Sequence, residues 1–118
     1  MKLRIKGNSI RLRLLRSEVE RFAAEGRISD EISFGGNALR YTLLASDTAA
    51  THAAMGNGEI TITIPQNTAT EWTISDQVGI EAEHPIGEGK ILSILIEKDF
   101  VCVGRPDDPD RADAFSAT

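Results

Sequence analysis

The sequence has only one cysteine, Cys102, among its 118 residues. A single cysteine excludes an intrachain disulfide and a cysteine-rich zinc site. No apolar run approaches the roughly 20 residues that a membrane-spanning helix needs. A strand-like pattern starts directly after Met1, so we expect no secretory signal. These absences lead us to expect a cytoplasmic protein without a membrane partner.

Positive charge is scarce except near the N-terminus. The formal net charge is −5, yet residues 1–16 carry six cations and no acid, so the remaining residues sum to −11. An acidic protein with one basic segment is a poor non-specific nucleic-acid binder, because phosphate-backbone binding needs an accessible positive surface. The charge pattern favours internal ion pairing or a confined anion site, and we expect no nucleic-acid partner.

Turns that contain glycine separate segments in which apolar residues recur at every second position. This alternation is the signal of strands joined in hairpins. It predicts strands near residues 1–6, 9–14, 28–34, 38–45, 48–55, 59–64, 78–84 and 90–97. Two other segments predict helices: Ser17 with Glu20, and Thr68 with Glu71, have the spacing of a capping box, and Gly26 is expected to end the first helix.

The predicted order of elements is ββαββ, followed by ββαββ again. The distance from Asn8 to Asn57 is 49 residues, and the distance from Gly36 to Gly87 is 51 residues. Because these offsets agree, the sequence predicts two pseudo-repeats, which span about residues 1–46 and 48–97.

The fold class that follows is α+β. We expect one domain over residues 1–103, in which an eight-stranded antiparallel sheet is strongly curved or closed into a barrel. The two helices are expected to pack on its apolar face. Residues 104–118 are rich in proline and aspartate, and they are predicted to form a flexible acidic tail.

The first predicted hairpin, KLRIKGNSIRLRL, carries its cations at alternating positions. A turn at residues 7–8 puts Arg4 opposite Arg11. The same register puts Lys2 opposite Arg13, although like charges directly opposite each other destabilise a strand pair. An anion bound over them would offset that repulsion. The predicted ligand-binding residues are therefore the cations of the polar sheet face: Lys2, Arg4, Lys6, Arg11, Arg13 and Arg40.

Three explanations of these cations stay open. In the first, they form ion pairs with carboxylates of neighbouring strands, each worth about 0–1 kcal/mol when exposed. The carboxylates expected on that face are Glu31, Glu81, Glu83 and Glu97. In the second, the planar forks of the arginines hold a phosphorylated or carboxylate-rich small molecule. In the third, the cations face a macromolecular partner.

Glu81 and Glu83 are candidate metal ligands. They lie two residues apart and therefore on one face of a strand, so they could share a divalent cation such as Mg²⁺ or Mn²⁺. Ion pairing with the many cations of the hairpin is the simpler explanation of the two carboxylates.

One resemblance covers most of the chain, and a second concerns its architecture. The segments MKLRIKGNSIRLRL, RSEV, EWTISDQVGI and ILIEKDF resemble a family of small bacterial proteins of unknown function, which implies one compact domain and no assigned activity. The two ββαββ units resemble the CYTH-like triphosphate tunnel enzymes. That likeness implies a barrel in which the hairpin cations and Arg40 hold polyphosphate, while Glu81 and Glu83 hold a metal. However, the first strand reads KLRIK where that family has Glu-x-Glu-x-Lys, which argues against metal-dependent hydrolysis.

A third resemblance is local: the segment GNSIRLRLLRSEV is similar to part of the swapped-hairpin DNA-binding domains of antitoxins. It implies DNA binding by the hairpin, which the acidic remainder of the chain opposes.

Other familiar site patterns are missing. The sequence has no glycine-rich phosphate loop, nucleophile elbow or His-Glu-x-x-His motif. His52 and His84 stand too far apart for a metal-binding motif, and the apolar neighbours of Cys102 favour a buried thiol over a nucleophile. The sequence thus favours a non-enzymatic domain that binds an anionic, phosphorylated small ligand. A CYTH-like phosphohydrolase and a structural or protein-interaction domain are the alternatives.

Overall fold

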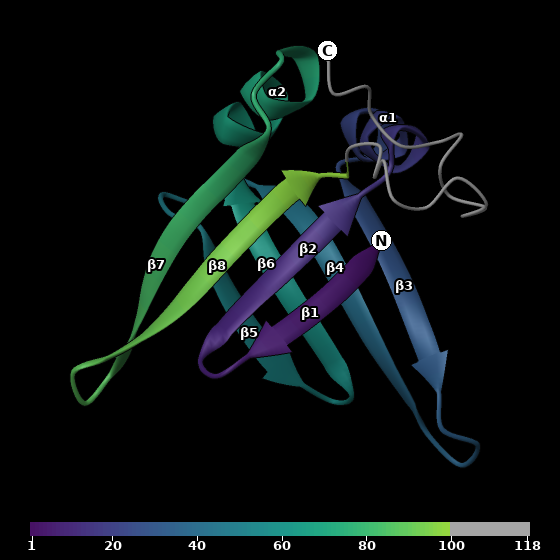
Figure 1. Ribbon diagram of the computed structural model, residues 1–118, viewed down its shortest axis with the longest axis vertical. Coiled ribbons are helices and arrows are strands. Elements are labelled where there is room, and N and C mark those ends of the chain that lie inside the picture. Colours follow the sequence, from purple (N-terminus) through teal and green to yellow (C-terminus); the bar gives the residue numbers. More distant parts are fainter. Residues whose placement is uncertain (100–118) are drawn as a thin grey trace, which may run out of the picture.

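A computed structural model describes residues 1–99 of the chain (Figure 1). Eight strands and two helices lie in that range. The strands are β1 (Lys2–Lys6), β2 (Ser9–Leu14), β3 (Arg27–Ser33), β4 (Ala38–Ser46), β5 (His52–Gly56), β6 (Glu59–Pro65), β7 (Gly79–Gly87) and β8 (Lys90–Lys98), and the helices are α1 (Arg16–Glu25) and α2 (Gln66–Ile74). The α+β class and the order of elements are confirmed. The predicted tail, residues 104–118, and Cys102 lie outside the described residues.

The strands form two four-stranded sheets. Sheet A has the order β1-β2-β8-β7, and sheet B has the order β3-β4-β6-β5. Both sheets are mixed, because β2 lies parallel to β8 and β4 lies parallel to β6. The expectation of one antiparallel sheet or barrel is therefore corrected. Alternation shows which face of a strand is apolar, but it does not show which hairpins become neighbours.

Each sheet combines one hairpin from the first half of the chain with one from the second half. Exchange of the halves replaces β1, β2, β8 and β7 by β5, β6, β4 and β3, so it converts the strand order of sheet A into that of sheet B. Core positions correspond as well. Leu12 is paired with Ile96 in sheet A, as Ile62 is paired with Leu43 in sheet B. The two sheets thus have equivalent strand orders, and the pseudo-repeats stay a prediction.

The core lies between the two sheets. Buried apolar side chains from β2, β3, β4, β6, β7 and β8 form one cluster with Phe22 of α1 and Trp72 of α2. Figure 1 shows one sheet in front of the other and both helices together at one end. The prediction that the helices cover the apolar sheet face is thus corrected: each sheet covers the other, and the helices close one end of the layer between them. The rings of Phe22 and Trp72 meet edge to face, with centroids 6.3 Å apart.

The helix ends differ from the predicted capping boxes. Leu15, not Ser17, precedes the first turn of α1, and the carboxylate of Glu18 accepts the backbone N–H of Leu15 at 2.8 Å. Thr68 likewise lies inside α2, which starts at Gln66. The predicted end of α1 is confirmed, because Gly26 adopts a φ of 77° and its N–H bonds the carbonyl oxygen of Phe22.

No helix within residues 1–99 has the length and apolar character needed to cross a bilayer.

Candidate functional site

The β1–β2 hairpin has the predicted register. Arg4 lies opposite Arg11, and Lys2 lies opposite Arg13. The alternate positions of β2, such as Leu12, are buried in the core, so the cations stand on the outer face of sheet A. A triphosphate tunnel would need a polar interior, but apolar side chains fill the space between these two separate sheets. The tunnel that the CYTH-like resemblance implied is therefore not present.

Three rows of neighbouring residues run across the four strands on this outer face. The register of the strand pairs defines them. From β1 to β7, the rows are Lys2–Arg13–Glu97–Gly79, Arg4–Arg11–Leu95–Glu81 and Lys6–Ser9–Ser93–Glu83. The charge consequently changes sign across the sheet, from cations on β1 and β2 to carboxylates on β7.

Two carboxylates neutralise part of the hairpin. The Nε of Arg13 donates to the Oε1 of Glu97 at 2.9 Å, and the Nε of Arg11 lies 3.6 Å from the same oxygen. The Nζ of Lys2 donates to the Oδ2 of Asp99 at 3.2 Å. Of the four carboxylates considered from the sequence, Glu97 is thus the one that pairs with the hairpin within the described residues.

The positive charge that remains is concentrated at the turn end of the hairpin. Within residues 1–99, Arg4 and Lys6 form no ion pair, and both are exposed. Counted over residues 1–99, the five hairpin cations and the two carboxylates that pair with them sum to a charge of +3. Arg4, Lys6 and the terminal nitrogens of Arg11 are therefore the groups best placed to receive an anion.

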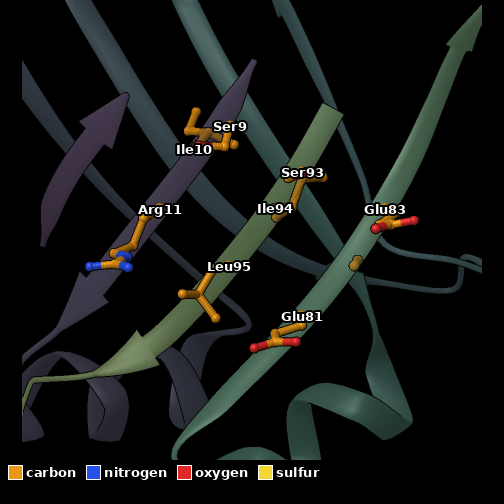
Figure 2. A pocket seen from close by; sticks show the side chains of 9 residues that line it. Ser9, Ile10, Arg11, Glu81, Glu83, Ser93, Ile94 and Leu95 are labelled. Atoms are coloured by element: carbon orange, nitrogen blue, oxygen red, sulfur yellow. The ribbon is translucent and has the colours of Figure 1, made fainter. Parts of the chain in front are cut away.

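A groove of about 520 Å³ lies beside these groups on the outer face. Figure 2 shows Arg11 on β2, Leu95 on β8 and Glu81 on β7 as a line across three strands. The residues that line the groove are Ser9, Ile10, Arg11, Glu81, Ala82, Glu83, Ser93, Ile94 and Leu95. One wall is thus cationic, the other is acidic, and a half-buried leucine and two serines lie between them.

Glu81 and Glu83 form the acidic wall. Both are exposed, and neither forms an ion pair with any residue of the described range, so their predicted pairing with the hairpin is not observed there. Residues 1–99 contain no group of three or more side chains suited to hold a metal ion. Mg²⁺ prefers about six oxygen ligands, so water would have to supply most of the ligands of an ion bound to Glu81 and Glu83.

Arg40 lies away from the hairpin cations. It belongs to β4 in sheet B, where its Nη2 donates to the Oε2 of Glu31 at 3.3 Å. The structure therefore brings together five of the six predicted ligand-binding residues and separates the sixth. Arg40 has the right alternation for a polar face, but alternation alone does not assign a strand to a sheet.

Sequence reasoning did not single out Ser9, Ser93 and Leu95 as site residues. Ser9 precedes Arg11 by two positions, a spacing that places both on one face. The contribution of β8 depends on its parallel pairing with β2, a contact between segments about eighty residues apart. No local pattern predicts that pairing.

The two histidines lie together at a junction between the sheets. His52 belongs to β5 in sheet B and His84 to β7 in sheet A, and their ring centroids are 6.0 Å apart. The backbone N–H of Ala53 donates to the Nδ1 of His84 at 3.3 Å. This contact joins two sheet edges and lies outside the groove.

One family model matches the chain, over residues 1–118, and its description is a family of unknown function (DUF7009). Neither the curated proteins nor the solved structures include a match. The resemblance to CYTH-like enzymes therefore has no support from a matching protein.

Proposed function

We propose that this chain, which belongs to the family of unknown function DUF7009, binds a small phosphorylated ligand on the outer face of sheet A. The pair Arg4 and Arg11 carries the proposal. These two guanidinium groups are directly opposite on adjacent strands, and Arg4 has no ion pair within residues 1–99. Guanidinium groups match phosphate oxygens in geometry and charge.

The neighbouring groups suit the same anion. Lys6 adds a third cation to the turn end of the hairpin, and the hydroxyl of Ser93 belongs to the adjacent row of the groove. The hydroxyl of Ser9 in the same row donates to the carbonyl oxygen of Lys6 at 2.8 Å. Clustered cations with hydroxyl donors are the usual recognition chemistry for phosphate groups. The ligand would also relieve the repulsion between Arg4 and Arg11, which are opposite each other in the hairpin.

The proposed activity is binding without turnover. The groove offers donors to an anion, but its lining contains neither a histidine nor a cysteine. Lys2 pairs with Asp99, and Arg13 pairs with Glu97. In this proposal these two cations contribute to the positive electrostatic potential of the face but do not contact the ligand.

The test is a thermal-shift panel of inorganic phosphate, phosphate monoesters, nucleotides and triphosphate at low ionic strength. Binding to the folded state raises the free energy of unfolding, by about 1.4 kcal/mol at a ligand concentration ten times the Kd. Stabilisation is expected to disappear in the double variant Arg4→Ala/Arg11→Ala. The matched control is Arg40→Ala, which removes an exposed arginine from sheet B.

Two outcomes count against the proposal. The first is a panel in which no phosphate compound stabilises the protein, and the second is equal stabilisation of the double variant. The same compounds are assayed for phosphate release with Mg²⁺ or Mn²⁺. Release that Glu81→Ala abolishes would replace simple binding by metal-dependent hydrolysis.

A further inference from the structure

We infer that the ligand of this groove carries a positively charged group as well as its phosphate. This inference rests on the proposed function and names the class of ligand for the same site. It depends on one row of residues along which the side-chain charge changes from positive to negative: Arg11 and Glu81 flank Leu95 on adjacent strands (Figure 2).

The dimensions of the sheet set the length of such a ligand. Neighbouring strands lie about 4.8 Å apart, so the backbones of β2 and β7 at Arg11 and Glu81 are separated by about 10 Å. The long side chains of both residues shorten the span that a ligand must bridge. A phosphate over Arg4 and Arg11 and an ammonium at Glu81 can therefore be joined by a chain of a few methylene groups.

Leu95 fits the middle of that ligand. It is half-buried and lies between the cationic and the acidic wall of the groove. An apolar side chain at this point gains from contact with methylene groups and offers nothing to a phosphate. The row thus matches the three consecutive parts of an aminoalkyl phosphate. Arg11 matches its phosphate, Leu95 its alkyl linker and Glu81 its ammonium group.

Glu81 and Glu83 are the reason to expect a positive charge at the end of the ligand that lies over β7. Their side chains are on the same strand face, and no cation of the described range pairs with them. The two carboxylates repel each other, and they would also repel a polyphosphate that extended across the groove. The acidic wall therefore selects against long polyanions while it favours a ligand with an amine, which is specificity by repulsion as well as attraction.

The experiment compares 3-aminopropyl phosphate with propyl phosphate by isothermal titration calorimetry near pH 7 and at low salt. The two compounds differ in the amine alone. The amine is expected to tighten binding about two- to fivefold, the size of effect that exposed charge pairs give. In the variant Glu81→Gln/Glu83→Gln, the two compounds are expected to bind equally, with propyl phosphate bound at least as tightly as by the native protein.

The matched control is Glu88→Gln, which removes an exposed carboxylate from the β7–β8 turn outside the groove. It should preserve the preference for the amine. Thermal melts of all variants check that these exposed substitutions leave the fold intact.

The outcomes separate this inference from the proposed function. Equal binding of the two compounds by the native protein, with a loss of both in Arg4→Ala/Arg11→Ala, would overturn the ligand class and keep the anion site. A preference that survives in Glu81→Gln/Glu83→Gln would also overturn it. If neither compound nor any other phosphate ester binds, the proposed function itself fails.

Discussion

The Nε of Arg13 donates to the Oε1 of Glu97 at 2.9 Å, across the parallel pair of strands β2 and β8. The same carboxylate lies 3.6 Å from the Nε of Arg11. Glu97, from the second half of the chain, thus neutralises the part of the hairpin at Arg11 and Arg13. At the turn end of the hairpin, Arg4 and Lys6 have no such partner within residues 1–99. Within residues 1–99, the hairpin is therefore divided into a part that is paired with carboxylates and a part, at Arg4 and Lys6, that has no ion pair.

The variant Glu97→Gln tests this division. Removal of the carboxylate charge frees Arg11 and Arg13 and ends the repulsion between Glu97 and a bound phosphate. Phosphate affinity should rise by about 0.5–1 kcal/mol, and the free energy of unfolding should fall by less than about 1 kcal/mol, since the arginines are partly exposed. Thermal melts with and without phosphate measure both quantities.

The control for that variant is Glu31→Gln. Glu31 also pairs with an arginine, but this pair lies on sheet B, where both side chains are about half exposed. Glu31→Gln should leave phosphate affinity unchanged. An increase in both variants would mean that net charge alone, not the position of Glu97, controls binding.

The elements and the hairpin register could be predicted because they depend on local information. Alternation marks the strands, and the short turn at Gly7 fixes which residues face each other, so the opposition of Arg4 and Arg11 followed from the sequence. The partnership of β2 with β8 joins segments far apart in the chain. For that reason the sequence left Glu97 as one of four candidate partners, and it grouped Arg40 of sheet B with the hairpin cations on one polar face.

The position of the helices shows the same limit. The helices were expected to pack on the apolar face of one sheet, but their side chains Phe22 and Trp72 are buried in the core that both sheets share. The amphipathic pattern shows that a helix has an apolar side but not what covers it. Because the two sheets cover each other's apolar faces, the helices pack at one end of the core that lies between the sheets (Figure 1).

Equivalent core positions in the two halves should make similar contributions to stability. Leu12 and Ile62 occupy corresponding strands, and each is 1% exposed. Leu12→Ala and Ile62→Ala should each reduce the free energy of unfolding by about 2–5 kcal/mol, through lost burial and the cavity that remains. Urea denaturation followed by the fluorescence of Trp72, the only tryptophan, gives the values.

The reference substitution for these two is Ile74→Ala. Ile74 is 79% exposed at the end of α2, so its truncation should change stability by no more than about 0.5 kcal/mol. A small effect at either Leu12 or Ile62 would contradict the shared core between the sheets.

Tyr41 gives a prediction on pH. Its hydroxyl donates to the carbonyl oxygen of Met1 at 3.0 Å. Burial raises the pKa of Tyr41 above its ordinary value of 10.0, and the negative charges of Asp30 and Glu18 raise it further. Because Tyr41 is the only tyrosine of the chain, the ultraviolet absorbance of tyrosinate reports its titration alone. The midpoint is expected above that of the unfolded chain in denaturant.

The direction of the stability change follows from that shift. The folded state keeps the phenol proton to a higher pH than the unfolded state, so the stabilisation from Tyr41 is complete below about pH 10 and is lost as the pH rises through the folded pKa. Tyr41→Phe should lack this alkaline loss.

The source of the shift can be tested at Asp30. Asp30→Asn should move the pKa of Tyr41 downward, because it removes one of the charges that oppose the phenolate. Glu31→Gln is its control: this neighbour pairs with Arg40 on the other face of β3. A tyrosinate midpoint that is the same in the folded and unfolded chain, or that responds equally to both substitutions, would contradict the burial of this hydroxyl beside Asp30.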